Sequence, residues 1–172
     1  MKIIGCFLLF IFYFISQNFG QNKCNCEAFI DWQYTAKIPI FDKPNGIVLD
    51  SISNDSINED FIMMIIIESQ NDYFKAIFQF EISDYYLEGW VRKSDYIGVY
   101  GRNYSGDVFY LYSEPNNNSK IASVVDTWIP ETYTIVECND DWAEVRMIYK
   151  NKVYNGWMEK KMRCPNPYTT CN

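Results

Sequence analysis

Beyond residue 36, apolar residues fall in short runs and do not recur at the spacing of an amphipathic helix. Runs rich in Ile, Val, Tyr and Phe are separated at short intervals by Asn, Asp, Gly and Ser. This pattern is typical of β-strands joined by turns, so we predict an all-β protein. The expected strands are Ile38 to Phe41, Ile47 to Ile52, Phe61 to Glu68, Tyr73 to Phe80, Gly89 to Lys93, Val108 to Tyr112, Ile121 to Val125, Tyr133 to Cys138, Trp142 to Tyr149 and Tyr154 to Glu159.

These strands divide into two copies of one pattern. Each copy has a strand ending in a proline turn, an Asn-Asp turn followed by an aromatic residue, and a Gly-Trp pair near its end. The landmarks are Pro44, Asn71-Asp72 and Gly89-Trp90 in the first copy, and Pro115, Asn139-Asp140 and Gly156-Trp157 in the second. The offsets between copies are 71, 68 and 67 residues, respectively. Solenoid repeats are shorter, roughly 20 to 50 residues, so each copy should be a small domain.

One predicted strand differs from its counterpart. Residues 61–67 are apolar at every position, so we expect both faces of this strand to be covered. The matching segment 132–137 alternates between polar and apolar residues, as a half-exposed strand does. The Asn-Asp turns supply residues that tolerate left-handed backbone conformations, so each should join two antiparallel strands.

The first twenty residues have the layout of a secretory signal. Lys2 precedes an apolar run from Ile3 to Ile15, and a more polar segment ends at Gly20. The run is shorter than the ~20 residues that a membrane-spanning helix needs, so we expect cleavage near Gly20-Gln21 and no membrane span in the mature chain. An uncleaved anchor or lipidation is the alternative. The predicted product is secreted or periplasmic.

The repeat and the signal together predict the organisation of the chain. A signal peptide (1–20) precedes an N-terminal segment (21–35), a first domain (36–98), a linker (99–106) and a second domain with a cysteine-containing tail (107–172).

Cysteine usage agrees with export to an oxidising compartment. The odd number of cysteines after residue 20 leaves at least one thiol free or intermolecular. Cys164 and Cys171 flank a turn-rich segment and are the preferred disulfide pair. Cys24 or Cys26 could instead pair with Cys138 or with the tail, and the sequence does not choose. A metal site at Cys24-Asn25-Cys26 would lack a second ligand pair, so we predict no metal.

Composition excludes several classes of function. Net charge is -7, and no basic run exceeds Lys160-Lys161, which argues against nucleic acid and anionic lipid as partners. The chain has no histidine, which removes the commonest general base and the usual catalytic zinc ligand. The carboxylate pairs Glu59-Asp60 and Asp140-Asp141 fit solvated turns, and the oxygen-rich segment 54–60 lacks the glycine of a calcium loop. We predict no enzyme and no cofactor.

Aromatic residues make up 18% of the chain and are the best candidates for function. Trp90, Trp142 and Trp157 lie in predicted strands, so we expect them in the core. Aromatic rings in loops offer flat area to sugars or proline-rich peptides. The loop candidates are Tyr85 and Tyr86 in a long hairpin, Tyr96 and Tyr100 at the domain junction, and Trp128 beside Pro130. Alternatively, these rings seal the interface between the two domains.

Each copy resembles a bacterial SH3-like (SH3b) domain. The resemblance is carried by residues 38–46 and 89–97 in the first copy, and by residues 111–115, 142–145 and 156–160 in the second. It implies two small five-stranded SH3-like barrels in tandem, each followed by a one-turn helix, at residues 93–96 and 160–162.

The same resemblance implies a role. Members of this family are exported and often accompany catalytic domains that cut or modify the cell wall, as targeting modules. No such domain accompanies the pair in this sequence, so we expect it to act alone or with a separate partner. The first hypothesis is a non-catalytic module that binds peptidoglycan, through its glycan or its stem peptide. The alternative is a protein-interaction module that docks onto an exported partner protein.

Overall fold

The computed structural model describes residues 22–169 and 171, so the predicted signal peptide and its cleavage site lie outside the described residues. The described chain folds into thirteen β-strands and one short 3₁₀ helix, which confirms the all-β class. The elements are β1 (Asn22–Ile30), β2 (Ile38–Phe41), β3 (Val48–Ile52), β4 (Ile62–Gln70), β5 (Tyr73–Phe80), β6 (Tyr86–Arg92), β7 (Ile97–Gly101), β8 (Phe109–Tyr112), β9 (Ile121–Val125), β10 (Tyr133–Asn139), β11 (Trp142–Tyr149), β12 (Lys152–Met158), η1 (Lys160–Met162) and β13 (Arg163–Cys164).

All ten expected strands are present, and β2, β5, β9 and β11 have the expected bounds. The hairpin turns also form as expected, with Asn71 and Asp140 in the left-handed region at φ 51° and 49°. The helix expected at residues 160–162 is η1, whereas residues 93–96 of the first copy form only a turn. Three strands were not expected. They are β1 in the N-terminal segment, β7 across the predicted boundary between the first domain and the linker, and β13.

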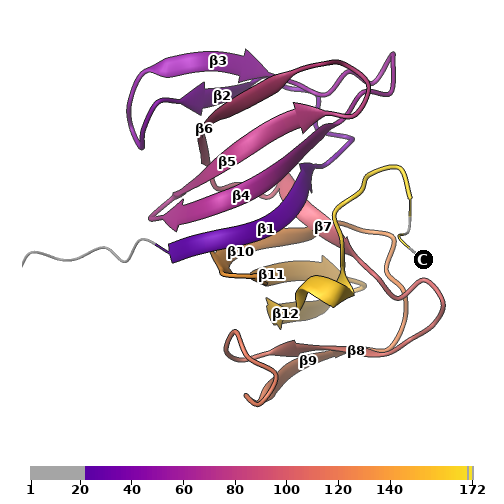
Figure 1. Cartoon of the computed structure of the whole chain (residues 1–172). Coiled ribbons are helices and arrows are strands. Elements are labelled where there is room, and N and C mark those ends of the chain that lie inside the picture. The colour runs from indigo at the N-terminus through magenta and orange to yellow at the C-terminus, as the bar shows by residue number, and fades with distance from the viewer. Residues whose placement is uncertain (1–21, 170, 172) are drawn as a thin grey trace, which may run out of the picture.

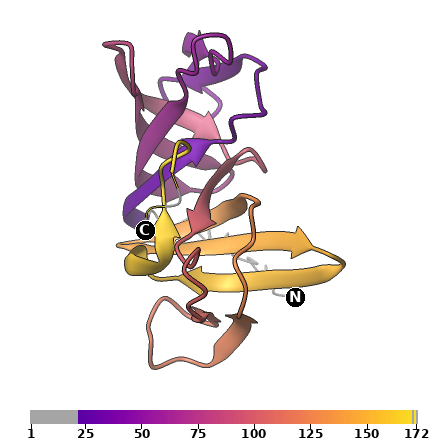
Figure 2. The ribbon, with the colours of Figure 1, turned by 90° about the vertical axis from the view of Figure 1, so that its right-hand side faces the viewer.

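The strands form one continuous antiparallel sheet that is not closed (Figure 1). Its order is β3-β2-β6-β5-β4-β1-β7-β10-β11-β12-β8-β9, and β13 pairs with β7 outside this path. The expectation of two separate five-stranded barrels is not confirmed, because β1 and β7 join the two copies edge to edge. Strands of the two copies run at a large angle to one another (Figure 2), as the twist of a long sheet requires.

The two copies repeat one topology and share a strand. The first copy has the order β3-β2-β6-β5-β4, and the second has the matching order β9-β8-β12-β11-β10. Beside β4 lies β1, and beside β10 lies β7, so the strand that precedes each copy pairs with the same element in it. β7 also pairs with β1, and β13 pairs with β7. Thus β7 is both the strand that follows the first copy and the strand that precedes the second.

The core runs continuously through both copies. Buried apolar side chains from β1, β7 and β10 lie at the junction, and they belong to the same hydrophobic cluster as the interiors of the two units. Fully buried residues at this junction include Phe29, Ile30, Ile97, Val99 and Tyr133. Separating the units would therefore expose apolar surface and open the ladders of β1 and β7.

Two expectations about burial need correction. In β4 only the face with Ile62, Met64 and Ile66 is buried, while the other face is half exposed. The tail loop lies over part of this second face, and Pro165 of the loop and Met63 of β4 line a small hollow there.

The tryptophans of the core divide in a similar way. Trp90 is 8% exposed, but Trp142 and Trp157 are only half buried. Successive side chains of a strand point to opposite faces. In β12 the buried positions are Tyr154, Gly156 and Met158, which leaves Trp157 on the outer face.

The glycine of each Gly-Trp pair lets two strands approach closely. Gly156 has φ +136°, and a Cβ built on it would lie 2.7 Å from the Tyr112 carbonyl oxygen and 3.1 Å from Ala122 Cβ. Gly89 holds the equivalent place in the first copy, against Ile40 and Phe41. A side chain at position 156 would therefore both strain the backbone and push β8 away from β12.

We expect Gly156→Ala to lower the free energy of unfolding by about 2 to 4 kcal/mol, through backbone strain and overpacking together. Denaturant titration followed by tryptophan fluorescence measures the loss. Gly106→Ala is the matched control, because Gly106 also has a positive φ (93°) but no atom within 4 Å of the added Cβ. Equal losses in the two variants would show that close packing around Gly156 does not contribute to the loss of stability.

The stability lost on truncating each tryptophan should increase with the burial of its side chain. We expect Trp90→Ala to cost about 3 to 5 kcal/mol, as large aromatic truncations in cores do. Trp142→Ala and Trp157→Ala should each cost less, since both side chains are already partly exposed to water. The measurement is the same denaturant titration, and a loss at Trp157 as large as at Trp90 would contradict the assignment of faces.

Candidate functional site

The candidate site is a cleft lined by aromatic and proline side chains, which we call the aromatic cleft. It has a volume of about 240 Å³. Its lining comes from three segments that are far apart in the sequence: β7, the loop between β9 and β10, and the tail after β13. The lining residues are Tyr100, Trp128, Pro130, Pro167, Tyr168 and Thr169. Two of the five predicted binding residues, Tyr100 and Trp128, are thus brought together.

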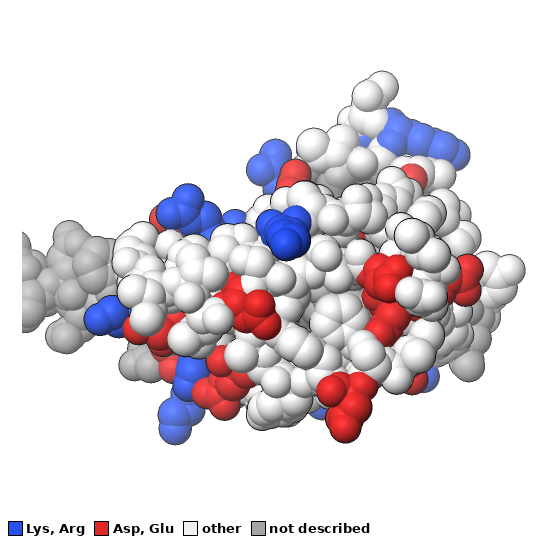
Figure 3. Space-filling view, turned by 90° about the horizontal axis from the view of Figure 1, so that it is seen from above, with Lys and Arg blue, Asp and Glu red and all other residues white. Residues whose placement is uncertain are grey.

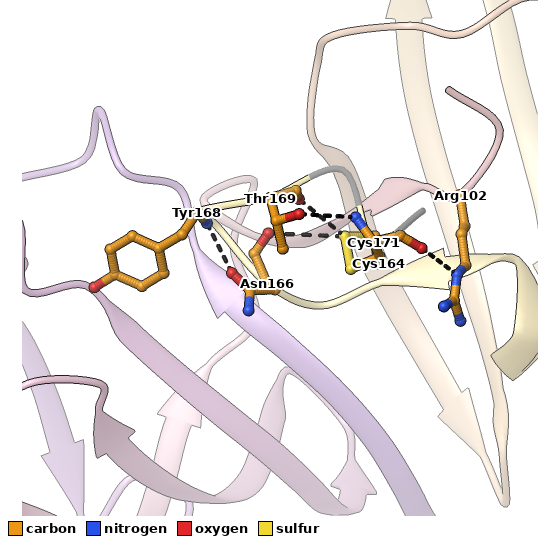
Figure 4. The surroundings of a disulfide bond; sticks show 6 residues. All are labelled: Arg102, Cys164, Asn166, Tyr168, Thr169 and Cys171. Carbon is orange, nitrogen blue, oxygen red and sulfur yellow. Dashed lines mark hydrogen bonds between the residues drawn. A yellow bond between two sulfur atoms is a disulfide. The ribbon is translucent and has the colours of Figure 1, made fainter. Parts of the chain in front are cut away.

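The tail wall of the cleft is held by a disulfide. Cys164 pairs with Tyr100 in the β13–β7 ladder, so the tail leaves the sheet directly beside the Tyr100 wall. Cys164 then bonds to Cys171 with a Cα–Cα distance of 5.5 Å, as expected from their spacing. Arg102 donates a hydrogen bond to the Cys171 carbonyl oxygen, on the side of the disulfide opposite Tyr168 (Figure 4). The loop is therefore closed at both ends against β7 and the residue after it.

Tyr168 attaches this loop to the first copy. Its hydroxyl donates to the Glu59 carbonyl oxygen at 2.8 Å and accepts from the Phe61 backbone N–H at 2.9 Å. The rings of Tyr168 and Phe61 pack with centroids 5.2 Å apart. Because Tyr168 touches the first copy while Trp128 belongs to the second, the aromatic cleft lies between the two units.

Trp128 supplies the most unusual polar group of the cleft. Its ring packs edge-on against Tyr104, with centroids 5.0 Å apart and an interplanar angle of 83°. Its indole Nε1 is buried but has no hydrogen-bond acceptor within the described residues. A buried indole N–H normally has a partner, and leaving one unpaired costs about 1 to 3 kcal/mol. The atom is shielded from solvent, so an acceptor oxygen in the cleft would pair with it once the ring shifts.

The lining of the cleft is uncharged, and charges of both signs lie near it: Asp31 and Glu131 act on Tyr100, and Arg102 holds the end of the tail loop. Burial raises the pKa of Tyr100, and the carboxylates of Asp31 and Glu131 raise it further, so this phenol stays protonated and can donate. The Tyr100 ring is fixed by Phe29, whose centroid lies 4.8 Å away. No lining residue carries a formal charge. The arrangement can hold a neutral, flat-faced group that accepts hydrogen bonds.

The other three predicted binding residues lie elsewhere. Tyr96 stacks on Tyr34 at 4.1 Å, in a separate open hollow that is also lined by Asp31 and Asp95. Tyr85 is half buried and packs edge-on against Phe80, and its hydroxyl donates to Asp50 at 2.7 Å.

Burial and the hydrogen bond to Asp50 raise the pKa of Tyr85 to about 12. Tyr86, next in the chain, is 65% exposed at the start of β6 and is the freest of these rings. The five candidates therefore do not form one surface.

The acidic loop at residues 54–60 uses its carboxylates internally. Asp55 accepts hydrogen bonds from the backbone of Ile57 and Asn58 and from the Asn58 side chain. Asp60 accepts from the backbone of Ile82 and Ser83 and from the Ser83 hydroxyl. These contacts close the loop against the next hairpin, which leaves few oxygens free for a ligand.

Sequence reasoning missed the tail residues of the cleft. Pro167, Tyr168 and Thr169 were seen only as the turn-rich interior of a disulfide loop. The signal that could have found them is the aromatic residue inside a segment closed at both ends by cysteine, because such a loop fixes its ring at little entropic cost.

Surface charge and comparisons add little to this picture. Seen from above (Figure 3), acidic and basic side chains are scattered over a mostly uncharged surface.

Among the described residues, no helix has the length and apolar character to cross a bilayer. The chain matches no protein-family model, and no curated protein shows significant similarity to it. The resemblance to SH3-like domains therefore stays a prediction.

Replacing both Cys164 and Cys171 by Ala should lower the free energy of unfolding by about 2 to 3 kcal/mol, as expected for a short disulfide loop. It should also release Tyr168, so the Phe61 amide, which donates to the Tyr168 hydroxyl, should exchange with solvent faster. Hydrogen exchange measured by NMR tests this. Tyr168→Phe, with the disulfide intact, is the matched control and should free the same amide. An unchanged Phe61 amide in the cysteine variant would show that the disulfide does not hold the cleft wall.

Proposed function

We propose that the protein is an exported, non-catalytic binding module that recognises cell-envelope glycan through the aromatic cleft. The observation that carries this proposal is an uncharged cleft of aromatic and proline side chains, one of which, Trp128, has a buried and unpaired Nε1. Signal-like residues 1–20 and the tail disulfide support an extracytoplasmic location.

The chemistry of the cleft suits a sugar ring. Aromatic and proline faces pack against the apolar face of a pyranose, while indole and phenol donors reach the hydroxyl or acetamido oxygens at its edge. A volume of about 240 Å³ is below the range of roughly 300 to 1,000 Å³ that encloses a drug-sized ligand. We therefore infer that the cleft takes one ring of a longer chain, with the rest of the polymer lying outside.

Charge favours glycan over stem peptide. The cleft offers no cation to a carboxylate, and Asp31 and Glu131 act on Tyr100 at its edge. A peptide carboxylate there would be repelled, whereas a neutral N-acetylated sugar would not. Within the peptidoglycan hypothesis, the glycan strand is thus the better ligand.

We further propose that the two copies are divergent SH3-like modules joined through a common strand. Their matching strand orders, the glycine that allows close strand crossing in each, and η1 after the last long strand of the second copy support this. In this proposal the open sheet arises because β7 belongs to both modules.

A second candidate function is docking onto an exported partner protein. Prolines 130 and 167 and the aromatic rings between them also form the kind of groove that binds extended proline-rich peptides. Asp31, Glu131 and the net charge of -7 would favour a peptide with basic residues beside its prolines.

Co-sedimentation of the purified protein with intact peptidoglycan sacculi at about 150 mM salt tests the first function, since this salt screens surface charge. We expect specific retention of the protein. Trp128→Phe, which keeps a ring but removes the N–H, should weaken binding about tenfold, the equivalent of 1.4 kcal/mol. Tyr86→Ala is the matched control, because it removes an exposed aromatic ring outside the cleft and should bind like wild type.

Two further outcomes separate the candidate ligands. Soluble chitooligosaccharides, which are neutral N-acetylated glycans without stem peptide, should compete the protein off intact sacculi if glycan is the ligand. Competition by soluble stem peptide alone would instead identify the stem peptide. No retention on sacculi, combined with NMR shifts of the Trp128 indole on adding a basic proline-rich peptide, would replace the first function by the second.

A further inference from the structure

Three cysteines outside the tail disulfide gather at the junction of the two copies. Cys24 and Cys26 lie on β1, and Cys138 lies on β10. The Sγ atoms of Cys26 and Cys138 are 2.8 Å apart, although the two residues are 112 positions apart in the sequence. A disulfide needs a separation of about 2.05 Å, so a small side-chain adjustment would allow this bond.

The backbone around these thiols holds them in place. The amide N–H of Asn25 donates to the Asp140 carbonyl oxygen, and the amide N–H of Asp140 donates to the Lys23 carbonyl oxygen, both at 2.9 Å. The Asn25 side chain adds a hydrogen bond to Asp141, also at 2.9 Å. The start of β1 is thus clamped to the β10–β11 turn, and the approach of the thiols is built into the fold.

A buried cation lies beside the pair. Arg163 is 3% exposed and uses Nη2 to donate to the Asp141 carbonyl oxygen, while its Nε and Nη1 have no acceptor within the described residues. The hydrogen bond from Cys138 lowers the pKa of Cys26 to about 7 against the effect of burial, and the charge of Arg163 contributes. Hydrogen bonds to Cys24 and Cys26 raise the pKa of Cys138. Cys26 is therefore the more acidic thiol of the pair, and when protonated it donates to the Trp142 carbonyl oxygen at 3.2 Å.

The three thiols differ in their exposure to solvent. Cys26 and Cys138 are fully buried, whereas Cys24 is partly exposed, so only Cys24 is open to a reagent in solution. Cys24 forms a β-bridge with Asp140, two residues from Cys138 in the sequence. The backbone thus brings Cys24, as well as Cys26, near Cys138.

We propose that these residues form a thiol–disulfide relay, in which Cys24 accepts a disulfide from an exogenous donor and passes it, through Cys138, to a buried Cys26–Cys138 bond. This inference is independent of glycan binding. The finished disulfide would fasten β1 to β10 across the junction between the copies.

Each step of the relay is an exchange between a thiolate and a disulfide. The Cys24 thiolate attacks a donor R–S–S–R, forms Cys24–S–S–R and releases R–S⁻. Cys138 then passes its proton to the neighbouring Cys26 thiolate as it attacks Cys24 Sγ, which releases the second R–S⁻ and forms Cys24–Cys138. Finally Cys26 loses that proton to solvent, attacks Cys138 Sγ and releases the Cys24 thiolate. The protein loses two electrons and two protons in total, and the donor becomes two thiols.

Oxidation of the purified, fully reduced protein by glutathione disulfide tests the relay. Samples are quenched by acid over time, alkylated and mapped by non-reducing peptide mass spectrometry. We expect wild type to end with Cys26–Cys138 and a free Cys24, and to unfold at a higher temperature than the same protein with that bond reduced. The Cys164–Cys171 bond is the internal control, since it reports that the oxidant is effective.

Three variants test the order of the steps. Cys24→Ser should reach the same final bond at least about tenfold more slowly, because the donor must then reach a buried thiol. Cys26→Ala should stop at Cys24–Cys138, and Cys138→Ala should stop at a mixed disulfide of Cys24 with glutathione.

Two results would overturn the proposal. If Cys26 and Cys138 both stay free in wild type while Cys164–Cys171 forms, the buried bond does not exist. If Cys24→Ser oxidises as fast as wild type, the bond exists but Cys24 is not its entry point, and the relay is wrong. Both results come from wild type or from a change at a partly exposed position, so they do not depend on the buried variants folding.

Discussion

The backbone pairing of β7 is the constraint on which the rest of the structure depends. This short strand forms ladders with β1, β10 and β13. An unpaired strand edge inside a core leaves N–H and C=O groups without partners, which is costly, so these ladders must form together. Their formation makes one sheet from two copies, buries Phe29 and Val99 at the junction and brings the tail beside Tyr100. The aromatic cleft is a consequence of the same pairing.

The sequence predicts what depends on neighbouring residues. Alternation of apolar and polar residues located ten strands, and the Asn-Asp turns located two hairpins, because both signals act over a few positions. It did not predict β1, β7 or β13. The first half of β1 is polar, β7 contains two glycines, and β13 has two residues, so each depends on distant partners rather than on its own pattern. Without these strands the two copies look like separate closed barrels.

The candidate site was predictable to a similar extent. Aromatic residues in loops were a sound criterion for Tyr100 and Trp128, which share the cleft. The criterion does not distinguish a ring that meets others from one held by its neighbours, as Tyr85 is by Phe80 and Asp50. Nor does a Gly-Trp pair say which face of its strand the ring takes, so Trp90 is buried while Trp157 is half exposed. Packing between the two units determines which rings meet and which face of its strand each tryptophan occupies.

The two-residue strand β13 connects the cleft to the thiol cluster. Successive side chains of a strand point to opposite faces. Arg163 accordingly acts on Cys26 on one side, while its neighbour Cys164 carries the disulfide that closes the cleft wall on the other. Both side chains are held by the ladder to Gly101 and Tyr100 of β7. The thiol cluster and the cleft wall are therefore adjacent, because both are anchored to the same two-residue ladder between β13 and β7.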